Sequence, residues 1–279
     1  VGTKVLVALE AGRFDTVGED LVNHSVNDIL VHGATPIAFM DYIAGSGLGV
    51  EQIAGLVEGI ARGCRAHGMA LAGGETAQMP GLYREGTYDL AGTIVGVVEE
   101  DAAIHGDAVR PGDVLLGYAS NGLHTNGYTL ARRIVFERMG LGMADRFGEL
   151  DRSVADVLLD VHRSYARSVM PVLSHIHGLA HITGGGIPGN LVRILPPGCE
   201  AVVDPDSWEL PPLFTTLQRA GKISTVEMRD VFNLGVGLVA VLPPQSVPAA
   251  QAAAAADGVD TWTMGDIRPG PQAVRFARP

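Results

Sequence analysis

Four short segments in which glycines stand beside polar residues constrain this chain most. They are "VGTK" at 1–4, "AGGETAQMPG" at 72–81, "SNGLHTNGY" at 120–128 and "HITGGGIPGN" at 181–190. Glycine accounts for 37 of 279 residues, nearly double the usual share of about 7%. A backbone without Cβ atoms lets N–H groups converge on an anion and lets a ligand approach closely. One such segment alone is most often a turn, but four together predict a fold that gathers them around phosphate.

The segment "HITGGGIPGN" gives the sharpest local prediction. A strand is expected to end at Thr183, and Pro188 suits the first turn of a helix, so free N–H groups at the helix start would face an anion. No lysine follows the last glycine, which excludes a Walker A loop.

The same glycines leave a rival hypothesis open. Gly184, Gly186 and Gly189 fit the pattern GxGxxG, with Asp206 or Glu209 about 20 residues further on, as in nicotinamide-dependent oxidoreductases. The position deep in the chain argues against it, because that pattern usually accompanies the first βαβ unit.

Two histidines and two acids are candidates for chemistry. His124 lies in a predicted loop, where it could act as an acid or base, or could simply be a surface residue. His181 borders the phosphate segment, although a local hydrogen bond at a strand end also explains it. Asp28 and Glu75 are candidate Mg²⁺ carboxylates; for Asp28 the alternative is a solvated helix face.

The apolar periodicity predicts an α/β fold in two halves, residues 1–105 and 106–279, with the boundary near 104–112. A helix at 16–32 carries a polar stripe of Asp20, Asn23, His24, Asn27 and Asp28. The other expected helices are 53–64, 127–139, 153–176, 188–195, 211–220 and the alanine-rich tract after 247. The expected strands are 37–44, 69–72, 88–98, 114–119, 200–203 and 236–242.

Composition excludes several classes of function. No uninterrupted apolar run reaches the roughly 18 residues of a membrane span, and the formal charge of -11 without a Lys/Arg block argues against nucleic acid. Cys64 and Cys199 lack CxxC spacing, which predicts neither a disulfide framework nor a zinc knuckle. A reducing, cytoplasmic setting is therefore expected, and no secretion signal is recognised.

Together with "VNDILVHGATPIAFMDY" at 26–42 and "FNLGVG" at 232–237, these segments resemble the aminoimidazole ribonucleotide synthetase family, also called phosphoribosylformylglycinamidine cyclo-ligase. The resemblance covers nearly the whole chain. It implies ATP-dependent closure of formylglycinamidine ribonucleotide to aminoimidazole ribonucleotide, with release of ADP and phosphate, in purine biosynthesis. It also implies a homodimer whose N-terminal halves form a central β-barrel flanked by helices, and a C-terminal half with a mixed sheet packed with helices. A sibling phosphoryl-transfer enzyme of this fold, such as selenophosphate synthetase or thiamine monophosphate kinase, is the other alternative.

The resemblance further implies roles for individual residues. Asp28 and His124 would be catalytic, and Asp28 and Glu75 would hold Mg²⁺. The ATP site would include Thr3, Lys4, Asn27, Asp28, Gly73, Gly74, Glu75 and Thr76. The substrate's 5′-phosphate would be bound by His181, Thr183, Gly184, Gly185, Gly186 and Asn190. The family motif has Asp-Gly directly before "VGTK", and this chain begins inside it at Val1; without that acid, weak ATP binding is expected.

Overall fold

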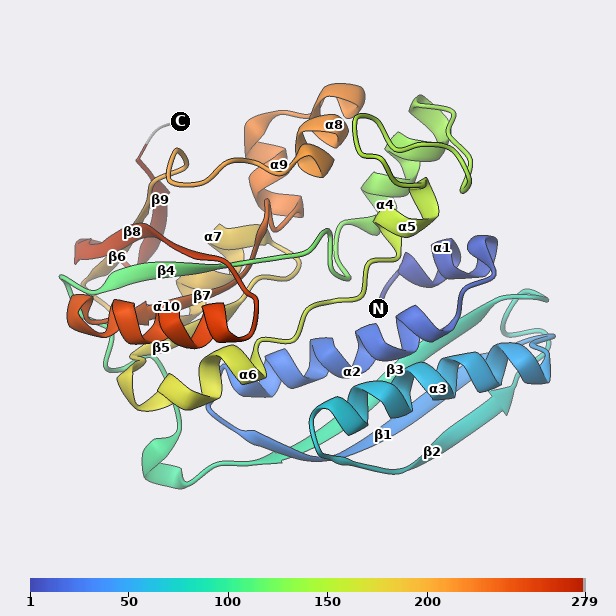
Figure 1. The fold of residues 1–279 in the computed structure, drawn as a ribbon, viewed down its shortest axis with the longest axis horizontal. Helices are drawn as coiled ribbons and strands as arrows, with labels where there is room; N and C mark the ends of the chain where they lie inside the picture. The colour runs from blue at the N-terminus through green and yellow to red at the C-terminus, as the bar shows by residue number, and fades with distance from the viewer. Residues whose placement is uncertain (278–279) are drawn as a thin grey trace.

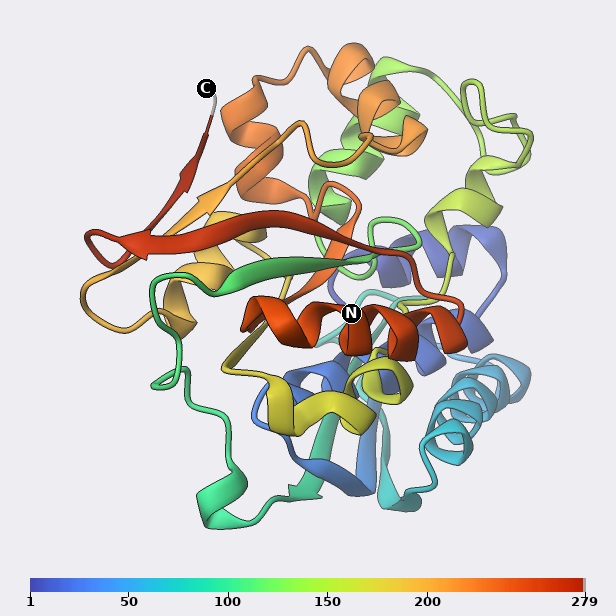
Figure 2. The same ribbon diagram turned by 60° about the vertical axis from the view of Figure 1, so that its left-hand side comes forward.

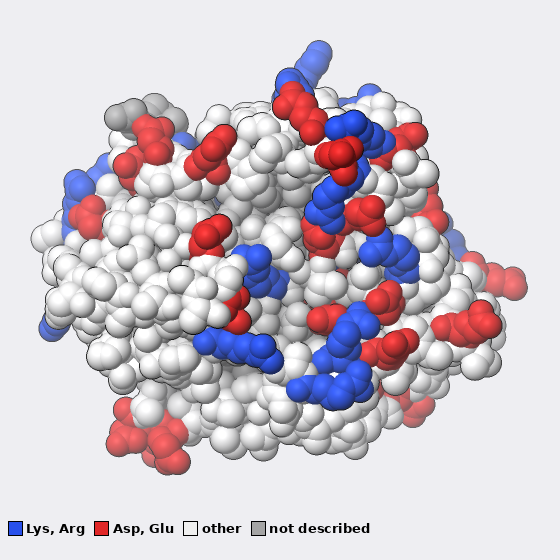
Figure 3. Space-filling view, viewed as in Figure 1, with Lys and Arg blue, Asp and Glu red and all other residues white. Residues whose placement is uncertain are grey.

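A computed structural model describes residues 1–277 as two β-sheets covered by helices (Figure 1). The α/β fold class expected from the sequence is confirmed, and the smaller sheet is curled like half a barrel. Within residues 1–277, no helix combines the length and apolar character needed to cross a membrane. On the face seen in Figure 3, Lys and Arg side chains are interspersed with Asp and Glu, so this face offers no continuous basic surface.

The N-terminal part carries a three-stranded sheet in the order β2-β1-β3, in which β1 is parallel to β2 and antiparallel to β3. Helices α2 and α3 pack against one face of this sheet, and the other face has no helix over it (Figure 1). Its elements are α1 (Lys4–Ala11), α2 (Asp15–Leu30), β1 (Thr35–Gly45), α3 (Val50–Ala66), β2 (Ala70–Gln78) and β3 (Tyr88–Val97).

Glycines allow α2 and α3 to approach each other closely. A Cβ atom on Gly59 would lie 1.9 Å from the carbonyl oxygen of Asp15, and one on Gly18 would lie 2.2 Å from that of Leu56. Beneath the helices, Phe39 of β1 is fully buried. This tight packing fixes α2, which carries the polar stripe, relative to the sheet.

The C-terminal part carries a six-stranded sheet in the order β5-β7-β4-β8-β6-β9, antiparallel except between β6 and β9. Its strands are β4 (Val114–Ala119), β5 (Gly178–His181), β6 (Cys199–Val203), β7 (Val236–Leu242), β8 (Thr261–Pro269) and β9 (Ala273–Phe276). Its helices are α4 (Tyr128–Arg132, continued by a π-helical segment Arg133–Arg138), α5 (Val154–Leu158), α6 (Ala166–Val169), α7 (Gly186–Leu191), α8 (Pro212–Gly221), α9 (Thr225–Val231) and α10 (Val247–Ala256).

Both faces of strand β7 are buried, as its uninterrupted apolar run predicts. Leu238 and Leu242 join the core that includes α10 and α2, whereas Val239 and Val241 join the core that includes α7. Figure 2 shows α10 and α7 on different sides of the sheet. The larger core therefore connects the two parts of the chain.

Several predicted elements are confirmed, among them α2, β4, β7, α8 and the alanine-rich helix α10. The buried strand expected at 69–72 is wrong in extent and burial. Strand β2 runs on through Gln78, mostly exposed, so Gly73–Thr76 lies in a strand at the edge of the sheet and not in a loop. The glycines permit this pairing, because a Cβ on Gly74 would lie 2.4 Å from the carbonyl oxygen of Asp41.

The single helix expected at 153–176 is also wrong. The chain forms α5, then an extended segment at 159–165, then α6 and a 3₁₀ turn at Met170–His175. The apolar residues of 153–176 recur at helical spacing, but side chains of α2 form hydrogen bonds with the backbone of residues 162–165, and these bonds compete with helix formation.

Candidate functional site

The polar stripe of α2 binds the backbone of the extended segment 159–165. Three of its side chains replace the hydrogen bonds that a helix would have made there. Asp20 Oδ1 accepts from His162 N at 2.6 Å, Asn23 Nδ2 donates to His162 O at 2.9 Å, and Asn27 Nδ2 donates to Arg163 O at 2.8 Å while its Oδ1 accepts from Tyr165 N at 3.0 Å. The stripe thus holds this segment extended and directs His162 into the interior.

We expect Asn27→Asp to lower the free energy of unfolding by at least about 1–3 kcal/mol, the cost of an unsatisfied buried polar group. The new carboxylate has no hydrogen to donate and would face the carbonyl of Arg163. Thermal or urea unfolding measures the change. Ser25→Ala on the same helix, where the hydroxyl donates only to Leu21 O within α2, is the control; an equal loss in both variants would contradict this role for Asn27.

Lys4 is fully buried and joins the N-terminus to both parts of the chain. Its Nζ lies 2.9 and 2.8 Å from the two carboxylate oxygens of Asp20, and it donates to the carbonyls of His124 at 3.1 Å and Asp160 at 2.7 Å. Burial lowers the pKa of Lys4 and raises that of Asp20, and their attraction opposes both shifts. These partners surround the ammonium of Lys4 in this structure. Nothing in the structure tests the expected contact of Lys4 with ATP phosphates, so it stays a prediction.

Four histidines gather beside Asp28, at the place where α2, the loop after β4, segment 159–165 and β5 meet. Asp28 Oδ1 lies 2.8 Å from His181 Nδ1, and Asp28 Oδ2 lies 3.1 Å from His24 Nε2. His162 Nε2 lies 3.1 Å from His181 Nε2, and the ring of His124 stacks on that of His162 with centroids 4.1 Å apart. The sequence-predicted residues Asp28, His124 and His181 are thus brought together with His24 of the predicted polar stripe and with His162, which the sequence does not predict for the site.

The electrostatics favour neutral imidazoles beside one ionised acid. Burial lowers the pKa of His124, His162 and His181. Burial alone would raise the pKa of Asp28, but hydrogen bonds from His181 and His24 outweigh it and hold that pKa well below its usual range. The site therefore offers proton acceptors and one fixed negative charge.

His124 is not a surface residue. It is 2% exposed, has a positive φ of 60°, and neither of its ring nitrogens has a hydrogen-bond partner within residues 1–277. A Cβ atom on Gly237 would lie 2.6 Å from its ring and 1.9 Å from Tyr165 Oη, which explains the second glycine of "FNLGVG". Both ring nitrogens of His124 are therefore left unused by hydrogen bonds within the described residues.

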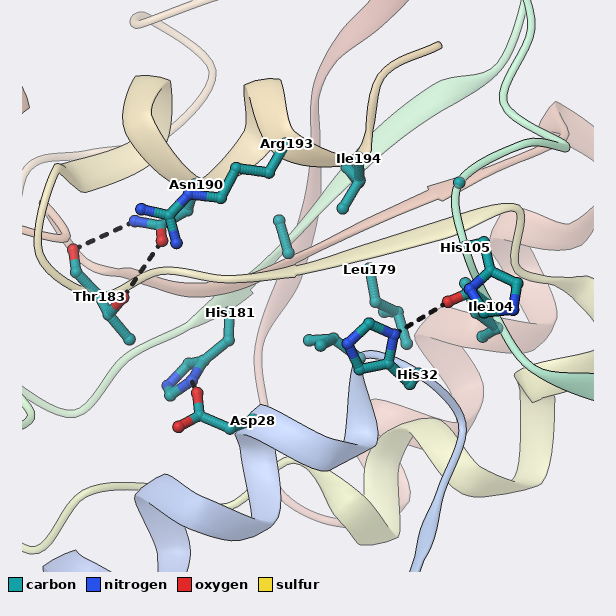
Figure 4. Close-up of a pocket in the computed structure, with 13 residues that line it drawn as sticks. Asp28, His32, Ile104, His105, Leu179, His181, Thr183, Asn190, Arg193 and Ile194 are labelled. Atoms are coloured by element: carbon teal, nitrogen blue, oxygen red, sulfur yellow. Dashed lines mark hydrogen bonds and ion pairs between the residues drawn. The ribbon is translucent and has the colours of Figure 1, made fainter. Parts of the chain in front are cut away.

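The predicted phosphate segment lines a cavity of about 310 Å³ next to Asp28 and His181. Thr183 and Asn190 are hydrogen-bonded to each other at 3.1 Å, and Asn190 also donates to the carbonyl of Gly186. Figure 4 shows Thr183, Asn190 and Arg193 on one side of this cavity and the Asp28–His181 pair on another. The hydroxyl of Thr183 and the amide of Asn190 therefore brace the segment by internal hydrogen bonds, and Arg193 adds a guanidinium group to the lining of the cavity.

The glycines of this segment have specific backbone functions. Gly185 and Gly186 have φ of 95° and 58°, and a Cβ on Gly186 would lie 1.8 Å from the carbonyl oxygen of Arg229. Within residues 1–277, strand β5 lies at the sheet edge and pairs with β7 alone, in the antiparallel direction, so the GxGxxG segment is not part of a βαβ unit of parallel strands. The structure therefore does not support the nicotinamide-dependent alternative, and Asp206 and Glu209 lose that role.

The remaining predicted residues lie apart from the cavity. Gly73, Gly74, Glu75 and Thr76 are on the exposed edge strand β2, where Glu75 Oε1 accepts from Thr76 N. Thr3 Oγ1 lies 3.2 Å from Thr129 Oγ1 and borders a second hollow with Asn126 and Gly127. Their assignment to the ATP site stays a prediction.

Sequence reasoning missed His162 and Arg193. His162 was hidden inside a predicted helix, and no spacing could have paired it with His181. Arg193 follows Asn190 by one helical turn, so a search for cations after the glycine segment would have found it.

Comparison with known proteins places the chain in a family. Two family models match in order: the N-terminal domain of AIR synthase related protein over residues 1–98, and its C-terminal domain over 110–276. The chain belongs to the AIR synthase related protein family.

Two relatives of this chain have the same name. A phosphoribosylformylglycinamidine cyclo-ligase from Sorangium cellulosum is 48% identical over 271 residues, covering 96% of this chain and 78% of that protein. One from Geobacter metallireducens is 50% identical over 249 residues, covering 88% and 72%.

Solved structures show the same fold at low identity. The thiamine-monophosphate kinase of Stenotrophomonas maltophilia has a TM-score of 0.71 at 18% identity, covering 95% of this chain and 79% of that one. Hydrogenase maturation protein HypE in complex with ATP has a TM-score of 0.66 at 20% identity, covering 93% and 75%.

Proposed function

We propose that the chain is a ligase that uses ATP to close formylglycinamidine ribonucleotide to aminoimidazole ribonucleotide, releasing ADP and phosphate, in purine biosynthesis. The observation that carries this proposal is a cavity lined by Asp28, His181 and residues of the Thr183–Asn190 segment. His124 belongs to the histidine cluster that includes His181, where its ring stacks on that of His162. The name of the relatives in the family supports it. The buried, unpaired thiols of Cys64 and Cys199 fit a reducing, cytoplasmic setting.

The reaction requires an amide oxygen to become a leaving group. Transfer of the γ-phosphoryl of ATP to the formyl oxygen achieves this, after which the amidine nitrogen attacks the same carbon and phosphate departs. Positioning and charge balance do most of such work. Asp28 orients His181 and His24. The neutral ring of His124, whose nitrogens have no partner within residues 1–277, would accept a proton from the closing nitrogen.

The Mg²⁺ that accompanies ATP needs carboxylate oxygens. Glu75 fits, because it is an exposed carboxylate on β2 among residues assigned to the nucleotide. Asp28 fits less well, because each of its oxygens already faces an imidazole. Glu75 would hold the ion on the phosphates of ATP, where the cation neutralises charge during transfer.

The ATP site is proposed to lie along β2 and the N-terminal residues Thr3 and Lys4, in the half 1–105, with the substrate phosphate in the half 106–279. We propose a homodimer through the uncovered face of the three-stranded sheet. Ile37, Met40 and Tyr42 of β1, with Val95 and Val97 of β3, are exposed apolar side chains there. Two such faces packed together would complete a barrel, and sedimentation would detect the dimer.

Arg193→Met is expected to raise the KM for formylglycinamidine ribonucleotide about 10- to 100-fold with little change in kcat, the loss of one charge-assisted contact to phosphate. Steady-state kinetics at saturating ATP measures the effect. Arg65→Met removes an exposed arginine of α3, outside the cavity, and is the control. An unchanged KM in Arg193→Met would place the substrate phosphate elsewhere.

The activity itself is tested by coupled ADP release with formylglycinamidine ribonucleotide as substrate. Formation of ADP and aminoimidazole ribonucleotide in equal amounts supports the proposal. ADP formed only with selenide or thiamine phosphate would identify a sibling enzyme, and nucleotide binding without turnover would identify a silent binding protein.

A further inference from the structure

We propose that His24, His162 and His181 form a binding site for a transition-metal ion of the Zn²⁺ type, separate from the Mg²⁺ of the nucleotide. One nitrogen from each ring can be chosen so that all three lie within 4.8 Å of one another. The three rings come from α2, from segment 159–165 and from β5, so a bound ion would tie both parts of the chain together.

The hydrogen bonds around Asn27 determine which ring nitrogen of His162 carries the proton. The amide of Asn27 has a defined orientation, because Oδ1 accepts from Tyr165 N and Nδ2 donates to Arg163 O. The same Nδ2 lies 3.1 Å from His162 Nε2, and Thr125 Oγ1 lies 3.2 Å from His162 Nδ1. His162 therefore carries its proton on Nδ1, and the lone pair of its Nε2 accepts from Asn27.

Asp28, the hydrogen-bond partner of His181, determines which ring nitrogen of His181 carries the proton. Asp28 is an ionised carboxylate that only accepts hydrogen bonds, so His181 Nδ1, 2.8 Å from it, carries the proton. In neutral His181 the lone pair is then on Nε2, which lies 3.1 Å from His162 Nε2. Two unprotonated ring nitrogens thus lie 3.1 Å apart, and a cation that binds both would replace the hydrogen bond from Asn27 to His162.

Metal chemistry fits this geometry. Nitrogens bound to tetrahedral zinc at about 2.0–2.1 Å are about 3.3 Å apart, close to the separation of the two Nε2 atoms. A ligating histidine usually donates its other N–H to a carboxylate or a similar acceptor, as His181 does to Asp28 and His162 to Thr125. Burial lowers the pKa of His162 and His181, which favours the neutral rings that ligands must be. Three imidazoles favour Zn²⁺ or Co²⁺ over Mg²⁺.

The cluster contains further features that favour a cation. Asp28 adds a negative charge 3.1 Å from His24 Nε2, and the nearby Lys4 ammonium is neutralised by Asp20. The ring of His124, with both nitrogens unpartnered, stacks on His162. Asp28 thus supplies a negative charge next to two of the three proposed ligands.

Co²⁺ titration of the chelator-treated protein tests the site by the visible absorption of tetrahedral Co²⁺. We expect one equivalent to bind, to be displaced by Zn²⁺, and to raise the melting temperature. His162→Asn and His24→Gln should each weaken binding by more than the roughly 10- to 100-fold typical of losing an outer-shell partner. His175→Gln, at an exposed position outside the cluster, should bind as the unchanged protein does.

The absence of a tetrahedral band, or the same affinity in His24→Gln, would overturn the proposal. In that case a proton on His181 Nε2, donated to His162 Nε2, would explain their distance of 3.1 Å. His24 is partly exposed, so its variant decides the matter even if His162→Asn does not fold. The readout is metal binding, so its outcome does not depend on the cyclisation activity.

Discussion

Asp28→Asn is expected to lower kcat of the cyclisation by about 10²- to 10³-fold, the range seen when one preorganised electrostatic contact is removed from an active site. The carboxylate orients both His181 and His24 and supplies the negative charge of the cluster. An amide has one accepting oxygen and would direct an NH₂ group at the second ring. Steady-state kinetics with saturating ATP and substrate measures the loss.

Asp101→Asn, at an exposed acid of the loop after β3, is the matched control and should be as active as the unchanged protein. The melting temperature of both variants checks that the fold is intact. If folded Asp28→Asn turned over at a near-normal rate, Asp28 would have no part in the mechanism. A rise in KM alone would instead make it a binding residue.

Lys4→Met is expected to lower the free energy of unfolding by about 3–5 kcal/mol, because it leaves the carboxylate of Asp20 buried without its counter-charge. The ammonium also satisfies the carbonyls of His124 and Asp160, which would lose their donor. Urea unfolding measures the difference, and Asp20→Asn should have a loss of similar size.

Arg13→Met removes the exposed ion pair with Asp156 and is the control, with an expected loss below about 1 kcal/mol. The double variant Lys4→Met with Asp20→Leu should recover part of the loss, because no buried charge remains. A loss in Lys4→Met no larger than in Arg13→Met would show that the buried pair does not stabilise the fold.

Local sequence signals were sufficient for the elements whose hydrogen bonds are made within the element or with strands of clear apolar character. The apolar runs at 114–119 and 236–242 became β4 and β7, and the polar stripe was placed on α2. Strand β8, at the centre of the larger sheet, was missed because its sequence mixes polar and apolar residues. The strand predicted at 69–72 ends before β2 does, because glycines such as Gly73 and Gly74 are typical of a turn.

The residues of the candidate site also include some that the sequence predicts and one that it does not. Asp28, His124, His181 and the Thr183–Asn190 segment could be proposed from residue type, spacing and motif order. His162 could not, because its helical spacing is overridden by hydrogen bonds from α2 that come from residues more than 130 positions away.

By itself, the sequence determined which backbone positions are free of side chains and which polar residues share one face of α2, since both follow from residue identity and helical period. Only the tertiary structure decided that this face binds an extended backbone segment, that Lys4 is neutralised by Asp20, and that four imidazoles meet at Asp28. These contacts join segments far apart in the chain, and their energies depend on burial, which local sequence does not specify.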